Sequence, residues 1–236
     1  MDIQERVREV QRRLARAAEA AGRAPAEITL CAATKTQDCA AVRAAVAAGI
    51  SVCGENRVQE LAAHLEEGAY AGAEVHFIGR LQTNKVNKVV GRAALIHSVD
   101  SLRLLQTVES QAARLGVRQD ILLEINIGRE DSKGGIDPGR TEEMARAAVG
   151  MEHIRLRGLM AIPPISAVPG GSRHFFAEMY QLFVDIRTKM SDNQYIDCLS
   201  MGMSGDFEDA IAEGATLVRV GTALFGPRPP VRTAQP

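Results

Sequence analysis

The 236-residue sequence has no tryptophan and only nine aromatic residues, three tyrosines and six phenylalanines. Aromatic surfaces on which nucleobases stack would have to be built from very few side chains. Positive and negative charges also nearly cancel, because 28 lysines and arginines face 29 aspartates and glutamates, for a formal net charge of −1. With no overall positive field to attract nucleic acid or an anionic membrane, we expect neither as a partner.

Cysteines and long apolar runs are also scarce. The four cysteines form no C-x-x-C pair and join no histidine cluster, which disfavours a disulfide framework and a metal site. The charged, amphipathic N-terminus lacks the apolar core of a secretory signal, and no run of about 18 apolar residues occurs to span a bilayer. We therefore expect a reduced, cytoplasmic location.

The sequence does contain a regular alternation of short apolar runs and amphipathic segments. An opening helix with apolar residues from Ile3 to Ala17 ends near Gly22. Eight strands are predicted at ITLCAATK, SVCG, VHFIG, ALIHSV, DILLEINI, IRLRGLMA, YIDCLSM and TLVRVG. Helices are predicted between them over residues 39–48, 57–66, 83–90, 102–114, 138–149, 175–190 and 206–212, with none after the last strand.

This strict alternation predicts a parallel sheet with right-handed crossovers. Eight such units favour closure into a single α/β domain, a (β/α)8 TIM barrel with an extra N-terminal helix, and a doubly wound open sheet is the alternative. No shift in composition marks a second domain, so residues 1–226 are predicted to form one domain. The proline-rich residues 227–236 are predicted to be a flexible C-terminal tail.

In a parallel barrel the active site lies at the C-terminal ends of the strands. The residues predicted at those ends are Lys35, Glu55, Asn56, Gly79, Asp100, Asn126, Met160, Ser204 and Arg219 to Thr222. Lys35 is the most informative of them, because a desolvated lysine has a lowered pKa and its neutral amine forms imines with carbonyls. The alternatives are a lysine that extends to solvent at the barrel rim or one that pairs with Glu55.

Small residues gather at the last two strand ends, where Gly202, Ser204 and Gly205 precede Gly221 and Thr222. Backbone N–H groups and hydroxyls in such a place suit a phosphate, and barrels frequently bind one after strands seven and eight. The alternative is structural: Ser204 or Asp206 caps a helix and Gly221 serves a tight turn.

A carbonyl-reactive lysine beside a phosphate site favours either a sugar phosphate, as in aldolases, or pyridoxal 5′-phosphate. Arg219 helps to separate them, because a guanidinium on the last strand would donate a hydrogen bond to a pyridine nitrogen without protonating it. A salt bridge from Arg219 to Glu124 is the competing interpretation.

Seven blocks, ATKTQ, GENRVQE, HFIGRLQTNKV, SVDS, EINIGREDSKGG, GLMAIPP and LSMGMSGDFEDAIAEGATLVRVGTALFG, resemble the pyridoxal phosphate homeostasis protein family. They run in the family's order from about Val7 to Gly226. The resemblance implies a fold-type III barrel similar to the N-terminal domain of alanine racemase, with pyridoxal 5′-phosphate as cofactor. It also implies a monomer.

By the same resemblance, Lys35 would form the internal aldimine, Asn56 would approach the phenolic oxygen of the cofactor and Ile78 would pack beside its ring. Arg219 would face the pyridine nitrogen, and the phosphate would be surrounded by Met203, Ser204, Gly221 and Thr222. Relatives usually have Ser where this chain has Thr34, many have Tyr at Arg57, and Gln37 is another departure. These differences leave the cofactor positions intact but put a partner-specific surface in doubt.

Amino-acid turnover needs more than an imine, because racemisation requires an acid or base on each face of the substrate. The side chains considered for the second group, Tyr70, Tyr180, Tyr195, His76, Cys53, Cys198 and His174, fall in poor positions, with the loop residue His174 the best placed. We therefore expect a binder that stores or buffers the cofactor or delivers it to apo-enzymes, with little or no turnover and no catalytic residue. A single-domain racemase and an aldolase are the alternatives.

Lys85 and Lys88 lie three residues apart on a predicted helix and could attract an incoming phosphorylated ligand. A solvated helix face is the commoner explanation of such a pair, because isolated surface lysines usually contribute little.

Overall fold

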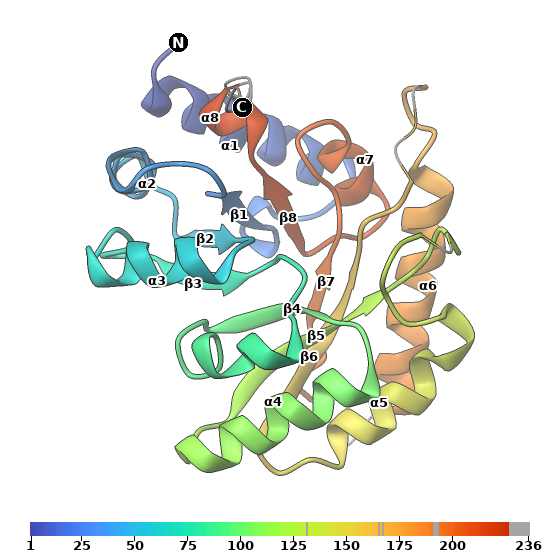
Figure 1. The fold of residues 1–236 in the computed structure, drawn as a ribbon. Helices are drawn as coiled ribbons and strands as arrows, with labels where there is room; N and C mark the ends of the chain where they lie inside the picture. The colour runs from blue at the N-terminus through green and yellow to red at the C-terminus, as the bar shows by residue number, and fades with distance from the viewer. Residues whose placement is uncertain (131, 165, 167, 191–193, 227–236) are drawn as a thin grey trace, which may run out of the picture.

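In the computed structural model, residues 1–130, 132–164, 166, 168–190 and 194–226 are described, so the predicted tail lies outside the described residues. Eight parallel strands close into one barrel in chain order, and β1 pairs with both β2 and β8 (Figure 1). The strands are β1 (Thr29–Ala33), β2 (Val52–Glu55), β3 (Glu74–Phe77), β4 (Leu95–Val99), β5 (Gln119–Ile125), β6 (Ile154–Ala161), β7 (Cys198–Ser200) and β8 (Leu217–Val220). The barrel prediction is confirmed and the open sheet is excluded.

Helices surround the barrel. They are α1 (Ile3–Ala20), α2 (Cys39–Ala47), α3 (Val58–Glu66), α4 (Leu102–Leu115), α5 (Thr141–Val149), α6 (Arg173–Lys189), α7 (Phe207–Ala212) and α8 (Thr222–Phe225), with short 3-10 helices η1 (Pro25–Glu27), η2 (Thr83–Lys88) and η3 (Pro138–Arg140). No helix in the described ranges is long and apolar enough to cross a membrane.

Two helix predictions were wrong. The segment predicted as a helix over residues 83–90 forms the 3-10 helix η2 instead. Asn84 and Asn87 fall inside it, and asparagine side chains compete with the helical backbone for hydrogen bonds. A helix also follows the last strand, where none was predicted, because α8 has only four residues and so short a segment carries no readable periodicity.

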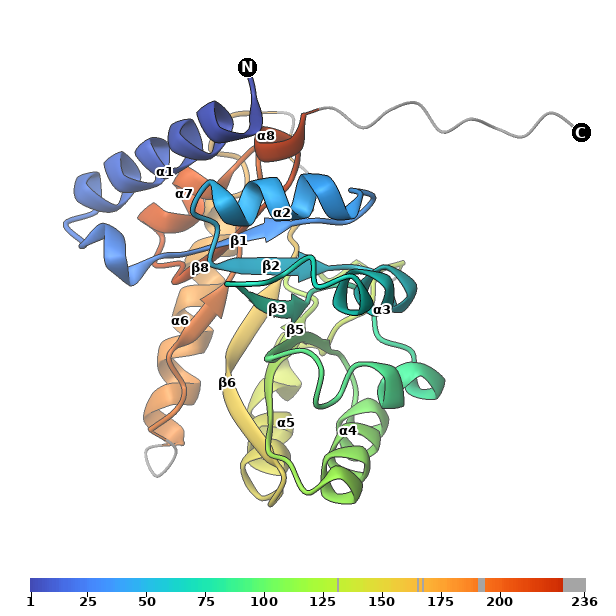
Figure 2. The ribbon, with the colours of Figure 1, turned by 90° about the vertical axis from the view of Figure 1, so that its left-hand side faces the viewer.

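The extra N-terminal helix α1 begins with a capping box, in which Asp2 and Glu5 each accept a hydrogen bond from the other's backbone N–H. Its buried face, formed by Val7, Val10, Leu14 and Ala18, packs beside α7 and α8 (Figure 2). Because α7 precedes β8 and α8 follows it, α1 packs against the segment that carries several predicted site residues.

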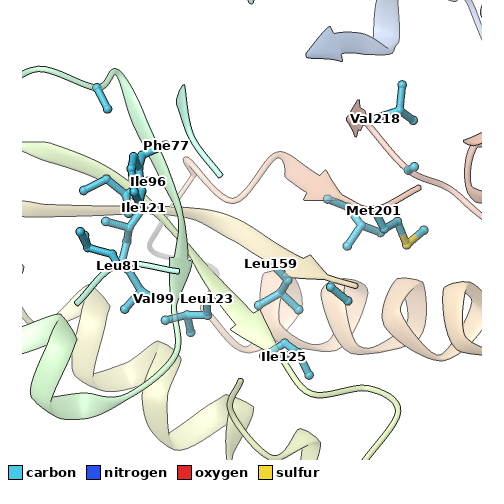
Figure 3. Packing of buried hydrophobic residues seen from close by; sticks show 14 of the residues in the cluster. Phe77, Leu81, Ile96, Val99, Ile121, Leu123, Ile125, Leu159, Met201 and Val218 are labelled. Atoms are coloured by element: carbon cyan, nitrogen blue, oxygen red, sulfur yellow. The ribbon is translucent and has the colours of Figure 1, made fainter. Parts of the chain in front are cut away.

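The main core lies between the outer faces of the strands and the surrounding helices. Figure 3 shows part of it, with Phe77, Ile96 and Ile121 packed together. Side chains alternate along a strand, so the neighbouring positions point into the barrel. The inward positions form two small apolar clusters, one around Cys31, Ala33, Val52, Ile78 and Leu217 and one around Leu95, Leu122 and Met160.

Candidate functional site

A cavity of about 600 Å³ lies at the C-terminal ends of the strands. All eight predicted cofactor-binding residues line it: Lys35, Asn56, Ile78, Met203, Ser204, Arg219, Gly221 and Thr222. Six other strand-end residues do not line it, namely Glu55, Gly79, Asp100, Asn126, Met160 and Val220. The structure therefore brings the predicted site residues together, while their binding roles stay predictions.

Lys35 lies between an anchored residue and a strained one. The hydroxyl of Thr34, immediately before it, donates to Glu55 Oε1 at 2.5 Å. Thr36, immediately after it, has φ of 64°. The left-handed region is unfavourable for a β-branched side chain, and such strain collects at functional sites. The chain thus turns sharply at the position that presents the lysine to the cavity.

Glu55 supports this turn from outside the cavity. Its Oε1 also accepts from Tyr70 Oη at 2.8 Å and lies 2.9 Å from His64 Nδ1, under helix α3. The carboxyl is fully buried. Burial and the neighbouring carboxylate raise the pKa of Tyr70, which keeps its hydroxyl protonated as a donor. Glu55 therefore has a structural role at the wall of the barrel, and it does not line the pocket that Lys35 lines.

Asn56 is positioned by a close approach of two strand ends. A Cβ on Gly79, after β3, would lie 2.2 Å from the carbonyl oxygen of Asn56, so only glycine fits there. The side-chain Oδ1 of Asn56 is buried and has no hydrogen-bond partner among the residues that the structure describes. Since buried polar atoms in folded proteins are nearly always paired, this oxygen is suited to a donor group on a bound ligand.

Ser204 ties the ends of β7 and β8 together. Its Oγ accepts from the backbone N–H groups of Gly221 at 3.0 Å and Ala223 at 3.4 Å. The hydroxyl keeps its own proton to donate. Ser204 is therefore not the cap of α7. Asp206, which precedes α7, makes no capping bond either, and instead accepts from the backbone N–H of Met203 at 2.7 Å.

Arg219 is 4% exposed and forms part of the cavity wall. Its Nη1 donates to Ser200 Oγ, and its Nη2 donates to the carbonyl oxygen of Ala161 at 2.9 Å. No ion pair joins it to Glu124 within the described ranges, so that competing interpretation is wrong. Burial lowers the pKa of Arg219, yet an arginine pKa starts so high that the guanidinium stays charged.

None of the seven side chains considered as a second acid or base lines the cavity. His174 stacks on Phe175 in α6, and Tyr180 is 45% exposed on the same helix. Burial raises the pKa of both Cys53 and Cys198 to about 12, which keeps these thiols protonated. The titratable groups that do line the cavity are Lys35, Asp206, Asp209 and Arg219.

Sequence reasoning missed part of the wall. Thr36, Gln37 and Asp209 line the cavity, as do Ile162, Pro163 and described residues of the loop before α6. The double glycine at Gly170 and Gly171 indicates a loop in the sequence, but it does not predict that residues of this loop line the cavity. Lys85 and Lys88 lie on η2 and do not line the cavity. No cluster of metal-ligating side chains occurs in the part of the chain that the structure describes.

Comparison with known proteins agrees with this geometry. The family described as alanine racemase, N-terminal domain, matches residues 6–229. A solved alanine racemase from Clostridium difficile shares the fold with a TM-score of 0.69 at 15% identity, covering 93% of this chain and 57% of that one. The protein PipY of Synechococcus elongatus, solved with PLP bound, superposes with a TM-score of 0.83 at 32% identity, covering 95% of this chain and all of that one.

The pyridoxal phosphate homeostasis protein of Aquifex aeolicus is 40% identical over 228 residues, which is 97% of this chain and 99% of that protein. Both chains are therefore alike from end to end, without a large additional domain in the relative. The chain belongs to the pyridoxal phosphate homeostasis protein family, within the wider family of alanine racemase N-terminal domains.

Proposed function

We propose that this protein binds pyridoxal 5′-phosphate in the cavity at the strand ends, and that it stores, buffers or delivers the cofactor. The observation that carries the proposal is that one cavity joins a lysine amine, a buried guanidinium, a hydroxyl donor and an unpartnered amide oxygen. A PLP-bound relative and a relative named for PLP homeostasis support it.

The residues present fit this group by their chemistry. When bound, pyridoxal phosphate supplies an aldehyde that condenses with a primary amine and releases water. Lys35 would supply the amine. Ser204 would donate its hydroxyl proton to the phosphate, next to Met203, Gly221 and Thr222, and Arg219 would donate to the ring nitrogen.

The same residues argue against efficient amino-acid turnover. A guanidinium keeps its proton, so Arg219 would leave the ring nitrogen unprotonated and make the ring a weaker electron sink. No tyrosine, histidine or cysteine of the described ranges lines the cavity to serve as the opposing acid. We therefore favour a carrier over a racemase. The one-domain organisation of residues 1–226, the monomeric state and the cytoplasmic location stay predictions.

The proposal is tested by mixing the purified protein with pyridoxal phosphate, reducing with borohydride and mapping the added mass. We expect the mass on Lys35, and no stable adduct in Lys35→Ala. Lys88→Ala, on an exposed part of η2, is the matched control and should load like the wild type. A wild-type protein that gains no mass at Lys35 would contradict the proposal.

Turnover and delivery need separate measurements. Incubation of the loaded protein with amino acids in deuterated solvent should introduce deuterium at Cα only very slowly, whereas a racemase would exchange it rapidly. Transfer to an apo-enzyme is compared with release into buffer. Faster transfer indicates delivery, and equal rates favour buffering.

A further inference from the structure

A line of four buried polar side chains crosses the inside of the barrel beneath the cavity. Arg219 Nη1 donates to Ser200 Oγ, Ser200 Oγ lies 3.0 Å from His97 Nδ1, and His97 Nε2 lies 3.0 Å from His76 Nδ1. These residues come from β8, β7, β4 and β3, and each is at most 5% exposed. Neither histidine is used by the site described above.

The line joins the two ends of the barrel. Arg219 lines the cavity at the C-terminal ends of the strands. His76 lines a second cavity of about 440 Å³ at the opposite ends, where its Nε2 lies 3.6 Å from Glu74 Oε2. Buried polar groups are costly unless each one is paired, so four of them from four strands in contact across the barrel interior form a specific arrangement.

Arg219 fixes the direction of the hydrogen bonds along this line, because a guanidinium can only donate. Ser200 Oγ must accept from it, and the buried hydroxyl then needs an acceptor for its own proton. Among the described residues, the only other polar atom within hydrogen-bond distance of this hydroxyl is His97 Nδ1. An unpaired buried O–H is unfavourable, so Ser200 donates to His97 Nδ1.

The remaining protons follow from this step. A neutral His97 that accepts at Nδ1 carries its proton on Nε2 and donates it to His76 Nδ1. His76 in turn carries its proton on Nε2, toward the second cavity and Glu74. Burial lowers the pKa of both histidines, which agrees with two neutral rings.

We propose that Ser200, His97 and His76 are positioning residues, which form a one-way hydrogen-bond chain that holds the Arg219 guanidinium in a fixed plane at the wall of the cofactor cavity. Ala161 O accepts from the other Nη atom, so two acceptors on β6 and β7 hold both arms of the guanidinium. The consequence for cofactor binding rests on the proposed function, whereas the hydrogen-bond chain itself does not depend on that function.

The first test uses the cofactor-free protein and nitrogen-15 NMR. We expect His76 and His97 to be neutral with the proton on Nε2, and the Arg219 Nη signals to be resolved because rotation of the guanidinium is hindered. In Ser200→Ala the Nη signals should average. A His97 protonated on Nδ1, or Nη signals that stay resolved in Ser200→Ala, would overturn the proposal.

The matched control is Ser98→Ala, because Ser98 is 1% exposed on β4 and its hydroxyl finds no hydrogen-bond partner in the described part of the chain. Ser98→Ala should leave the Arg219 signals as in the wild type. Ser200→Thr retains a hydroxyl at the same position and should restore them, which a loss of packing alone would not explain.

The second test measures affinity for pyridoxal phosphate. Ser200→Ala should weaken binding about tenfold, the order expected for one lost hydrogen bond to a charged group, while Ser200→Thr and Ser98→Ala stay within about twofold. Equal affinities of Ser200→Ala and Ser98→Ala would refute the role in cofactor binding. A wild type that binds no cofactor refutes the proposed function instead. The NMR result then shows whether the hydrogen-bond chain exists, independently of cofactor binding.

Discussion

At the scale of single residues, the reactive position depends on its two neighbours in sequence. Thr34 is anchored through its hydroxyl to the carbonyl oxygen of Gly54 and to Glu55, so the end of β1 cannot shift relative to β2. Thr36 adopts the left-handed conformation that threonine rarely takes. Lys35 therefore follows a residue held by hydrogen bonds, Thr34, and precedes a residue with a strained backbone, Thr36.

Thr36→Gly should raise the free energy of unfolding by about 1 kcal/mol. Relief of the strain at φ of 64° stabilises the folded protein by roughly 1–3 kcal/mol. The greater conformational freedom of glycine in the unfolded chain opposes this by about 0.4–1 kcal/mol. Urea denaturation measures the difference. Thr83→Gly, at the start of η2, relieves no such strain and should destabilise the protein. Equal losses in both variants would show that Thr36 is unstrained.

At the scale of elements, the sequence predicted the order of strands and helices because each element carries its own periodicity. It therefore also predicted, to within a few residues, where each strand ends. Through the family resemblance it predicted that Lys35 and Ser204 share a site. Contacts between elements carry no such local signal. That Ser204 holds Gly221 and Ala223 depends on how β7 and β8 lie against each other in three dimensions.

The buried histidines show the same limit. A histidine in a short apolar run such as VHFIG is most often an ordinary core residue, so the sequence does not single out His76. Its pairing with His97 depends on the register of β3 against β4 and on both side chains pointing into the barrel. Neither property is encoded in the local sequence around one strand.

The contact between the ends of β2 and β3 gives a prediction at this scale. Gly79→Ala should destabilise the protein by about 1–3 kcal/mol and weaken cofactor loading, because the new Cβ would push the backbone of Asn56 away from the cavity. Gly150→Ala, at the end of α5 and away from the cavity, is the matched control, since a Cβ there meets the Arg146 carbonyl oxygen at an ordinary distance of 3.4 Å. Thermal denaturation and cofactor titration of both variants check this. Similar behaviour of the two alanines would contradict it.

At the scale of the whole molecule, the barrel is a scaffold with a polar interior rather than an apolar core on both sides of the sheet. The main apolar core lies outside the strands, whereas the inside holds the chain from Arg219 to His76 between two small apolar clusters. The free energy of unfolding should therefore depend on the protonation state of the buried polar groups inside the barrel, His76 among them.

This dependence has a definite sign. Burial lowers the pKa of His76 to about 4 from its usual value near 6.5, against the opposing influence of Glu74 on the same strand and Asp120 on β5. Arg157 on β6 further disfavours the charged ring. The unfolded chain thus binds this proton more tightly than the folded one, so the contribution to stability is complete above pH 6.5 and is lost as the pH falls toward 4.

We expect the free energy of unfolding to decrease by about 3 kcal/mol from this histidine between pH 6.5 and 4, measured by urea denaturation at closely spaced pH values. His76→Asn should be less stable at neutral pH but flatter across this window, because the titrating group is gone. His174→Asn, which removes an exposed histidine from α6, controls for the loss of one imidazole and should retain the wild-type slope. If His76→Asn keeps the full slope, other groups cause the acid sensitivity, and the buried ring does not resist protonation in the folded barrel.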